Sequence, residues 1–214
     1  MKVKCLLTGL VTLLSCLLIL SLAVGDDDEI ENMARGGDFE TADDRNQWNL
    51  NLGGGSASAT MTLDNKDAAV GDSSLFIDDI VLDPAASWKP QIDQGDIPIF
   101  EKDEYTISAF LKGEASRPVG MYSEILVDPW TKSPSQTVTI TTEWVEYWAT
   151  GVPPDDMVGI GFSNGGSTVS YWIDGVRFYA GEYVPTDLDD GEPQIGVTRK
   201  DKLATTWGEL KHTF

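Results

Sequence analysis

The side chains that could support chemistry in this chain are carboxylates and aromatic rings. Its single histidine is His212, and its only cysteines are Cys5 and Cys16. A Ser-His-Asp or Cys-His arrangement needs an imidazole beside the nucleophile, so neither can be built in the middle of the chain. Zinc prefers cysteine and histidine ligands, whereas carboxylate oxygens suit calcium or magnesium. No glycine-rich loop follows a strand pattern and opens a helix, so we find no phosphate-binding motif.

Acidic residues are so abundant that most of them are expected to be solvated surface. The chain has 35 Asp and Glu against 15 Lys and Arg, with a net charge of −20. Such a chain repels phosphate backbones and anionic membranes, so we expect no nucleic-acid partner and no membrane contact beyond the amino-terminal segment. The excess of carboxylates suits calcium. The acids that could form the carboxylate pair of a glycoside hydrolase include Asp78, Asp79, Asp93, Asp96, Glu124 and Asp128, and the sequence favours no particular pair.

The seven tryptophans and six tyrosines are many for a chain of this length. A flat aromatic ring can stack on the axial C–H face of a sugar, while amides and carboxylates bind the sugar hydroxyls. Trp48, Trp144 and Tyr105 lie in or at the start of alternating segments, and we assign them to the core. Trp88 and Trp130 lie in turn-like segments that contain proline, so core filling and ligand contact explain them equally well.

The first 25 residues have the pattern of a signal peptide, which we assign to residues 1–25. Lys2 and Lys4 precede an almost wholly apolar run from Leu6 to Val24, and acidic residues follow at once. A basic start, an apolar middle and a small-residue exit are typical of secretion, so we expect an extracellular or cell-surface protein. The alternative is an uncleaved membrane anchor, because the run is nearly long enough to span a bilayer. Both cysteines lie in this segment, so the exported chain has no disulfide, and a full core or a bound metal must tie down its loops.

Short alternating segments bounded by Gly, Pro, Asp and Asn dominate the rest of the chain. Eight to ten strands at regular spacing predict an all-β sandwich over residues 29–183. The predicted strands are Ser56–Leu63, Ser74–Val81, Tyr105–Lys112, Val119–Val127, Gln136–Thr141, Trp144–Thr150, Val158–Ser163 and Val169–Tyr179. The sequence Asn164-Gly165-Gly166 suits a tight hairpin between the last two.

The composition changes after Tyr183. Residues 184–202 are rich in Asp, Pro, Gly and Glu, which is typical of a linker. Leu203, Trp207 and Leu210 follow with helical spacing, but a helix this short is marginal on its own. We therefore assign 184–214 to an acidic linker and a short Trp-containing tail, which is either disordered or docks on a protein partner.

Five motifs occur in order along the chain. They are Gly37-Asp38-Phe39-Glu40 followed by Trp48, Gly71-Asp72-Ser73-Ser74-Leu75, Trp88-Lys89-Pro90-Gln91-Ile92 followed by Tyr105–Lys112, Thr141-Thr142-Glu143-Trp144, and Tyr171–Phe178. Together they resemble the carbohydrate-binding modules of families 4, 9 and 22, a group of galactose-binding-like jelly rolls. The resemblance covers residues 29–182, with departures from the group's usual residues at Gly36, Asp103 and Gly175. It implies a jelly-roll β-sandwich of eight to ten antiparallel strands that binds poly- or oligosaccharide without cleaving it. Such a domain is an accessory to glycoside hydrolysis or to cell-surface attachment.

The resemblance also implies a structural calcium ion that joins the first and last strands. In this group, a Glu of the opening motif, an Asp of the closing strand and backbone carbonyls supply the ligands. Matched residue by residue, these are the side chains of Glu40 and Asp174, with carbonyls near Asp38 and Asp72. A cation that binds oxygens from distant segments closes long loops, which suits a domain without disulfides. The alternative is that Glu40 is an ordinary exposed acid.

The sugar site of this group lies either on the concave face of a sheet or at the loops of one end, and the sequence leaves both open. The candidates are Trp88, Gln91, Arg117, Tyr122, Glu124 and Trp130, with Asn164 as a further option. Two other functions stay open: a structural or adhesive surface protein without a sugar site, and a small glycoside hydrolase or polysaccharide lyase that uses carboxylates.

Overall fold

The computed structural model describes residues 30–101 and 103–186, and the account below concerns the unit that begins at Asn32. The predicted signal peptide, and the linker and tail from residue 187 onward, lie outside the described residues. The elements are α1 (Ala42–Asn46), β1 (Asn49–Asn51), β2 (Ser58–Asp64), β3 (Ser74–Val81), β4 (Gln91–Pro98), β5 (Tyr105–Gly113), β6 (Arg117–Ile125), β7 (Lys132–Ile140), β8 (Val145–Gly151), β9 (Met157–Ser163) and β10 (Tyr171–Ala180). None of the helices in the described ranges is long and apolar enough to cross a membrane.

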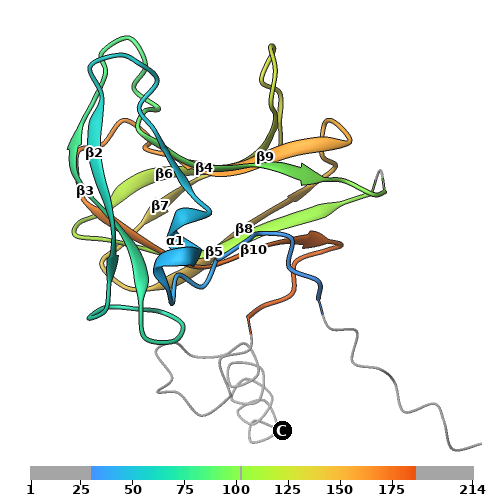
Figure 1. Cartoon of the computed structure of the whole chain (residues 1–214), viewed down its shortest axis with the longest axis horizontal. Helices are drawn as coiled ribbons and strands as arrows, with labels where there is room; N and C mark the ends of the chain where they lie inside the picture. The colour runs from blue at the N-terminus through green and yellow to red at the C-terminus, as the bar shows by residue number, and fades with distance from the viewer. Residues whose placement is uncertain (1–29, 102, 187–214) are drawn as a thin grey trace, which may run out of the picture. The chain divides into compact units, whose positions relative to one another are not determined.

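The ten strands form two five-stranded sheets. Sheet A has the order β1-β4-β9-β6-β7 and sheet B the order β2-β3-β10-β5-β8. All the pairings between these strands are antiparallel. The chain passes repeatedly from one sheet to the other, and Figure 1 shows the sheets as two stacked layers. This arrangement confirms the predicted jelly-roll β-sandwich.

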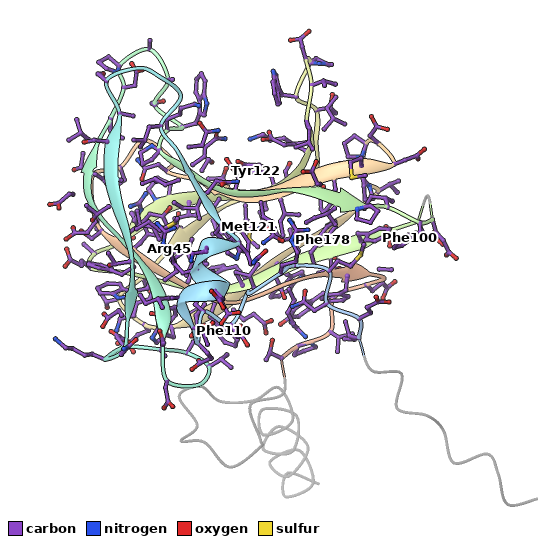
Figure 2. All side chains as sticks on the ribbon, viewed as in Figure 1. Arg45, Phe100, Phe110, Met121, Tyr122 and Phe178 are labelled. Atoms are coloured by element: carbon purple, nitrogen blue, oxygen red, sulfur yellow. The ribbon has the colours of Figure 1, made fainter. Side chains whose placement is uncertain are left out.

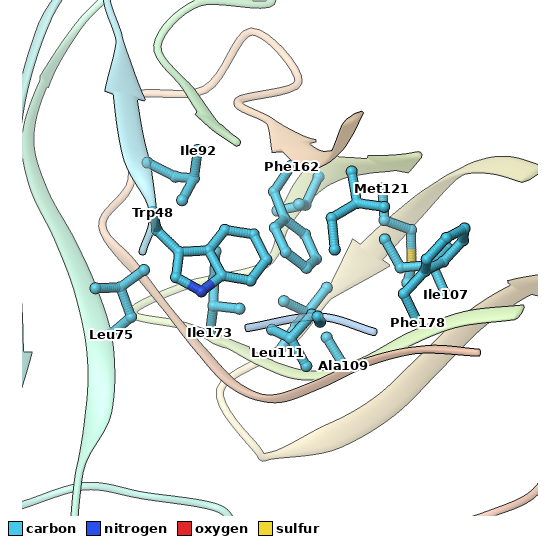
Figure 3. Packing of buried hydrophobic residues seen from close by; sticks show 14 of the residues in the cluster. Trp48, Leu75, Ile92, Ile107, Ala109, Leu111, Met121, Phe162, Ile173 and Phe178 are labelled. Atoms are coloured by element: carbon cyan, nitrogen blue, oxygen red, sulfur yellow. The ribbon is translucent and has the colours of Figure 1, made fainter. Parts of the chain in front are cut away.

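Apolar side chains from the inner faces of both sheets fill the space between them. Trp48 is 2% exposed, and its ring lies 5.7 Å from the ring of Phe39 and 6.1 Å from that of Phe162. Its indole N–H donates to the carbonyls of Arg35 and Gly36, so its polar atom is satisfied within the core. Figure 3 shows this ring at the centre of the cluster of buried side chains.

Two of the three aromatic residues assigned to the core are there. Trp48 and Tyr105 are each 2% exposed, as predicted. Trp144 is only partly buried and stands apart from the core cluster, where its indole N–H donates to a carboxylate oxygen of Asp67 at 2.8 Å. The sequence placed Trp144 in the strand, but β8 begins one residue later, at Val145. The Trp144 side chain therefore bonds to Asp67 instead of packing in the core.

The predicted hairpin at Asn164-Gly165-Gly166 is wrong. Strand β9 belongs to sheet A and β10 to sheet B, so this segment passes between the layers and does not join two paired strands. Gly165 and Gly166 have φ values of +66° and +77°, so the positive φ angles predicted for this turn are confirmed. The pattern gives the local turn but not the sheet to which each strand belongs.

The opening segment lies beside the closing strand β10. The backbone N–H of Met33 donates to the carbonyl of Phe178, and the N–H of Val176 donates to the carbonyl of Gly37, both at 2.8 Å. The side chain of Asn32 bonds both to the Val176 carbonyl and to the Phe178 N–H. The first and fifth sequence motifs therefore meet in space, which positions the residues of the predicted metal site.

Candidate functional site

A cleft of about 470 Å³ lies on the outer face of sheet A. It is lined by Asn51, Trp88, Lys89, Gln91, Glu124, Trp130 and Lys132. Within the strands, alternation directs the lining side chains outward, because Gln91 is followed by the core residue Ile92. Trp88, Lys89 and Trp130 reach the cleft from the loops next to β4 and β6. Figure 2 shows the same alternation in β6, where Met121 points into the sandwich and Tyr122 points away from it. Four of the six predicted sugar-site residues thus lie together on this sheet face: Trp88, Gln91, Glu124 and Trp130.

Two half-exposed indole rings stand at the cleft. Trp88 is 50% exposed and Trp130 is 53% exposed. Trp88 precedes β4 and Trp130 lies between β6 and β7, and in Figure 1 both connecting loops extend beyond sheet A on the side away from sheet B. The carbonyl of Trp88 accepts from the N–H of Asn164 at 3.0 Å, and the N–H of Trp130 donates to the Val127 carbonyl at 2.8 Å. The backbone of each residue is therefore anchored, while about half of each side chain stays accessible to solvent.

The conformation of Trp130 is strained. Its φ is +56°, in the left-handed region that non-glycine residues rarely adopt. The neighbouring bond from the N–H of Ile125 to the carbonyl of Thr131 closes the base of the loop at 3.0 Å. Strain of this kind is found preferentially at functional sites.

A glycine forms part of the floor of this sheet face. Gly161 of β9 lies opposite Asp93 of β4 on one side and Tyr122 of β6 on the other. A Cβ at this position would lie 2.6 Å from the carbonyl oxygen of Ile92 and 3.1 Å from the Tyr122 hydroxyl. A glycine inside a strand often marks close approach of a ligand or another backbone. We did not single out Gly161 from the sequence, although the alternation of Gly159 and Gly161 with apolar residues was a signal for it.

Tyr122 is the fifth predicted residue, and it lies beneath the cleft rather than open to it. It is 2% exposed, its hydroxyl accepts from the Gln91 side-chain amide at 2.9 Å, and the Lys132 ammonium lies 3.4 Å from the centroid of its ring. Burial raises the pKa of the Tyr122 hydroxyl, so this group is neutral at ordinary pH. The ring face is occupied by Lys132, so Tyr122 serves mainly to orient Gln91.

Glu124, which lines the cleft, and Asp93, which does not, are both held by polar neighbours. Glu124 forms an ion pair with Lys132 at 3.3 Å, and burial nevertheless raises the pKa of its carboxyl above the ordinary value. Burial also raises the pKa of Asp93, against hydrogen bonds from the amides of Asn51 and Asn49. Asn51 in turn accepts from the ammonium of Lys89 at 2.8 Å. Asn51, Lys89 and Lys132 were not among the sequence candidates, because isolated amides and lysines carry no pattern.

Arg117, the sixth predicted residue, lies away from the cleft. It is 2% exposed, and its guanidinium donates to the side chain of Asn164 at 2.6 Å and to the backbone carbonyls of Asn164 and Val169. It also lies 4.2 Å from the ring centroid of Tyr171. These contacts tie the segment between β9 and β10 to the sandwich. The structure therefore gives both Arg117 and Asn164, which is fully buried, positions inside the protein rather than on a ligand-facing surface.

The predicted metal residues Glu40 and Asp174 converge on the segment 69–72. Asp174 is fully buried, and its carboxylate accepts from the N–H groups of Ala69 at 2.7 Å, Val70 at 2.9 Å and Gly175 at 2.8 Å. Burial raises the pKa of Asp174 to about 7, and the charge of Glu40 contributes in the same direction. The Glu40 carboxylate accepts from the N–H of Asp72 at 3.1 and 3.2 Å.

The side chains of Asp38 and Asp72 are exposed and do not join these two carboxylates. In the described part of the chain, no three His, Cys, Asp or Glu side chains form a group that could hold a metal ion. No lysine or arginine of that part forms an ion pair with Glu40 or Asp174. Two carboxylates, one of them fully buried and neither ion-paired in the described ranges, are oxygen donors of the kind that a hard cation such as calcium prefers.

No protein-family model matches the sequence, and no curated protein matches it. Solved structures do. A family 4 carbohydrate-binding module is 26% identical, covers 69% of this chain and 99% of its own, and superposes with a TM-score of 0.55. A xylan-binding domain of family 22 is 17% identical and covers 70% of this chain and 95% of its own, with a TM-score of 0.53.

A further family 22 xylan-binding domain, from Paenibacillus barcinonensis Xyn10C, is 12% identical to this chain. It covers 72% of this chain and 93% of its own, with a TM-score of 0.51. These matches cover most of the described two-sheet unit. The chain therefore has the jelly-roll fold of the family 4, 9 and 22 group of carbohydrate-binding modules.

Proposed function

We propose that this domain binds poly- or oligosaccharide in the cleft of sheet A and does not cleave it. The observation that carries the proposal is the pair of half-exposed indoles, Trp88 and Trp130, on a sheet face that also carries hydrogen-bonding side chains. Indole rings stack on sugar C–H faces, and amides, carboxylates and ammonium groups bind hydroxyls. Because two of the similar structures are xylan-binding domains, xylan is the first ligand to test.

The open form of the cleft favours binding of a chain segment rather than of a single enclosed sugar. Only the two indoles offer large exposed apolar faces there, so the affinity for one chain is expected to be modest, with dissociation constants on the order of micromolar to millimolar. Gln91 and Glu124 are fixed by Tyr122 and Lys132, respectively. This preorganisation reduces the entropy that is lost when a sugar binds.

One observation favours a second candidate function. The charge of Asp93 raises the pKa of Glu124, so a second carboxylate lies within electrostatic reach of the one that lines the cleft. A glycoside hydrolase needs such a pair, with one member protonated. Against this, Lys132 neutralises Glu124, and amides of Asn49 and Asn51 hold Asp93. These partners favour fixed ligand-binding carboxylates over a catalytic pair.

A glycan array probed with the full chain tests both candidates. Retention on xylan or another β-linked glycan without release of reducing sugar supports the binding module. Release of reducing sugar over hours, abolished by Glu124→Gln or Asp93→Asn, would instead establish a hydrolase. No retention on any soluble or insoluble glycan at high protein concentration would favour the structural or adhesive alternative.

The proposal includes a structural calcium ion at Glu40 and Asp174. The ion would be held by these two carboxylates and by backbone carbonyls near Asp38 and Asp72, as the family resemblance implies. Bound calcium supplies positive charge beside a carboxylate that burial leaves without a cationic partner. The residues of this chain bring the opening motif, the segment 69–72 and β10 together around that position.

The same proposal covers the setting in which the domain works. Export by the amino-terminal segment places the domain where polysaccharides occur, and the domain then serves as an accessory that targets glycoside hydrolysis or attaches to a cell surface. In this proposal, the acidic linker and the Trp207 tail form the segment that binds a protein partner. Secretion is tested by the amino-terminal sequence of the protein recovered from the medium of cells expressing the full chain. A sequence beginning near residue 26 is expected, and retention in the membrane fraction would contradict it.

A further inference from the structure

The two lysines that line the cleft differ in their partners, because among the described residues only Lys132 of the two forms an ion pair. Lys132 forms an ion pair with Glu124 at 3.3 Å, so its charge is balanced. The ammonium of Lys89 donates to the amide oxygen of Asn51 at 2.8 Å, and within the described ranges it forms no ion pair. An ammonium carries three N–H donors, so Lys89 retains donors for a ligand in the cleft that it lines.

Lys89 is held in place by the loop between β1 and β2. Its side chain lies across Gly53, where a Cβ would come within 2.5 Å of three Lys89 side-chain atoms. Gly53 also has a φ of +69°, so both its conformation and its missing side chain suit this contact. A lysine fixed in this way loses less side-chain entropy on binding than one that moves freely in solvent.

An amide lies between Lys89 and the acid Asp93. Asn51 accepts from Lys89 with its oxygen, and the side chains of Asn51 and Asn49 hydrogen-bond to Asp93. Asp93 therefore contributes its charge at a distance without capping the ammonium. Asp93 and Glu124 lie within electrostatic reach of Lys89, but within the described ranges neither forms an ion pair with it. Beside the exposed ring of Trp88, the Lys89 ammonium can therefore donate to an anionic substituent of a ligand.

We propose that Lys89 forms a carboxylate-binding subsite beside Trp88, so that the cleft prefers polysaccharides that carry uronic acid residues over their neutral counterparts. A sugar ring stacked on Trp88 presents its substituents to the adjacent Lys89. A carboxylate there accepts a charge-assisted hydrogen bond, which is roughly twice as strong as a neutral one. The acidity of the rest of the surface repels densely charged polyanions, so the fitting ligand is a mainly neutral chain with sparse uronate groups. This inference rests on the proposed sugar-binding function.

The test is isothermal titration of the full chain with two matched ligands. One is a xylo-oligosaccharide with a single glucuronic acid branch, and the other is the same molecule after reduction of the carboxyl group to an alcohol. The acidic form should bind about tenfold more tightly than the reduced form. This difference in affinity, called the gap below, should narrow as salt is added. Lys89→Gln should close the gap. Lys66→Gln, a control in the exposed loop after β2, should preserve it.

A second variant moves Lys89 without removing its charge. Gly53→Ala places a Cβ where the Lys89 side chain lies, and it should narrow the gap while circular dichroism shows a folded protein. Equal affinity of the wild-type protein for both ligands would overturn the subsite and leave the proposed function standing. A gap that survives in Lys89→Gln would overturn the role of Lys89. Binding to neither ligand, together with no retention on a glycan array, would overturn the proposed function itself.

Discussion

The side-chain amide of Gln91 donates a hydrogen bond to the hydroxyl of Tyr122 across 2.9 Å, and so links β4 to β6 across Gly161 of the intervening strand. Both residues are nearly inaccessible to solvent. The bond fixes the amide at the base of the cleft and satisfies a buried phenol. Its removal therefore affects stability and ligand binding together.

Tyr122→Phe should lower the free energy of unfolding by about 1–2 kcal/mol, because the Gln91 amide loses a buried partner. Denaturant unfolding measures the change. Tyr147→Phe is the matched control, since its hydroxyl donates to the Thr139 carbonyl at an exposed position where water can replace it. Equal losses in the two variants would contradict the role assigned to the buried bond.

Trp88→Ala and Trp130→Ala should each weaken glycan binding by about 1–3 kcal/mol, the range for loss of a stacked ring at a ligand contact. Both rings are half-exposed, so the melting temperature should change little. Affinity electrophoresis and a melt measure the two quantities. Trp148→Ala is the control, because Trp148 is 45% exposed but belongs to β8 of sheet B. If Trp148→Ala reduced binding as much as the cleft variants do, the sugar site would not be in this cleft.

Gly161→Ala should lower both stability and affinity. The new methyl group would approach the Ile92 carbonyl oxygen to 2.6 Å and the Tyr122 hydroxyl to 3.1 Å, and overpacking of this kind costs about 1–3 kcal/mol. Gly95→Ala provides the comparison, because a Cβ there meets only Leu126 at 3.8 and 3.9 Å. Unfolding by denaturant and titration with ligand should separate the two variants. If Gly161→Ala changed neither stability nor affinity, the outer face of sheet A would not need a glycine at this position.

A chelator should lower the melting temperature, and added calcium should restore it. The reason is that the ion offsets the buried charge of Asp174 and the neighbouring charge of Glu40. Glu40→Gln should abolish the response. Asp72→Asn should retain it, because the Asp72 side chain is exposed and only its backbone is assigned to the site. Identical melts with and without chelator in the wild-type protein would exclude structural calcium.

The pKa of Glu124 gives a pH dependence with a definite sign. Burial raises this pKa in the folded state, so between pH 4.5 and the folded pKa the native carboxyl binds protons more strongly than the unfolded one. Its contribution to the free energy of unfolding therefore falls as the pH rises through that range. Glu124→Gln should gain stability relative to the wild-type protein over the same pH interval, measured by urea unfolding. A difference that is flat with pH, or of opposite slope, would contradict the buried environment.

The sandwich was predictable because its strands carry strong local patterns. Tyr105–Lys112 and Ser74–Val81 were predicted to within a residue of β5 and β3. Strand β4 was missed, because its outer face is polar and its sequence contains Gly95 and Pro98, which read as turn residues. Strand β1, with three residues, and α1, with five, are too short to show a period.

The candidate sites were predictable only where a side chain is distinctive. Tryptophans in turns pointed to the cleft, and the family resemblance paired Glu40 with Asp174. Alternation alone did not show that β5 is buried on both faces. The chain after β10 contacts its outer side, where the Thr106 hydroxyl donates to the Gly181 carbonyl. Arg177 of the neighbouring strand β10 donates to Ser108. Contacts of this kind depend on chain segments far apart in sequence, and a single sequence does not display them.

The burial of Trp48 has a consequence for spectroscopy. Its indole is enclosed by apolar rings and bonded to two carbonyls, so its fluorescence reports the integrity of the core, whereas Trp88 and Trp130 emit from the solvent boundary of the cleft. On the proposed function, a bound sugar would change the surroundings of the two boundary rings and leave those of Trp48 as they were. Unfolding changes all three. The protein thus contains intrinsic optical probes that distinguish occupancy of the cleft from loss of structure, without an attached label.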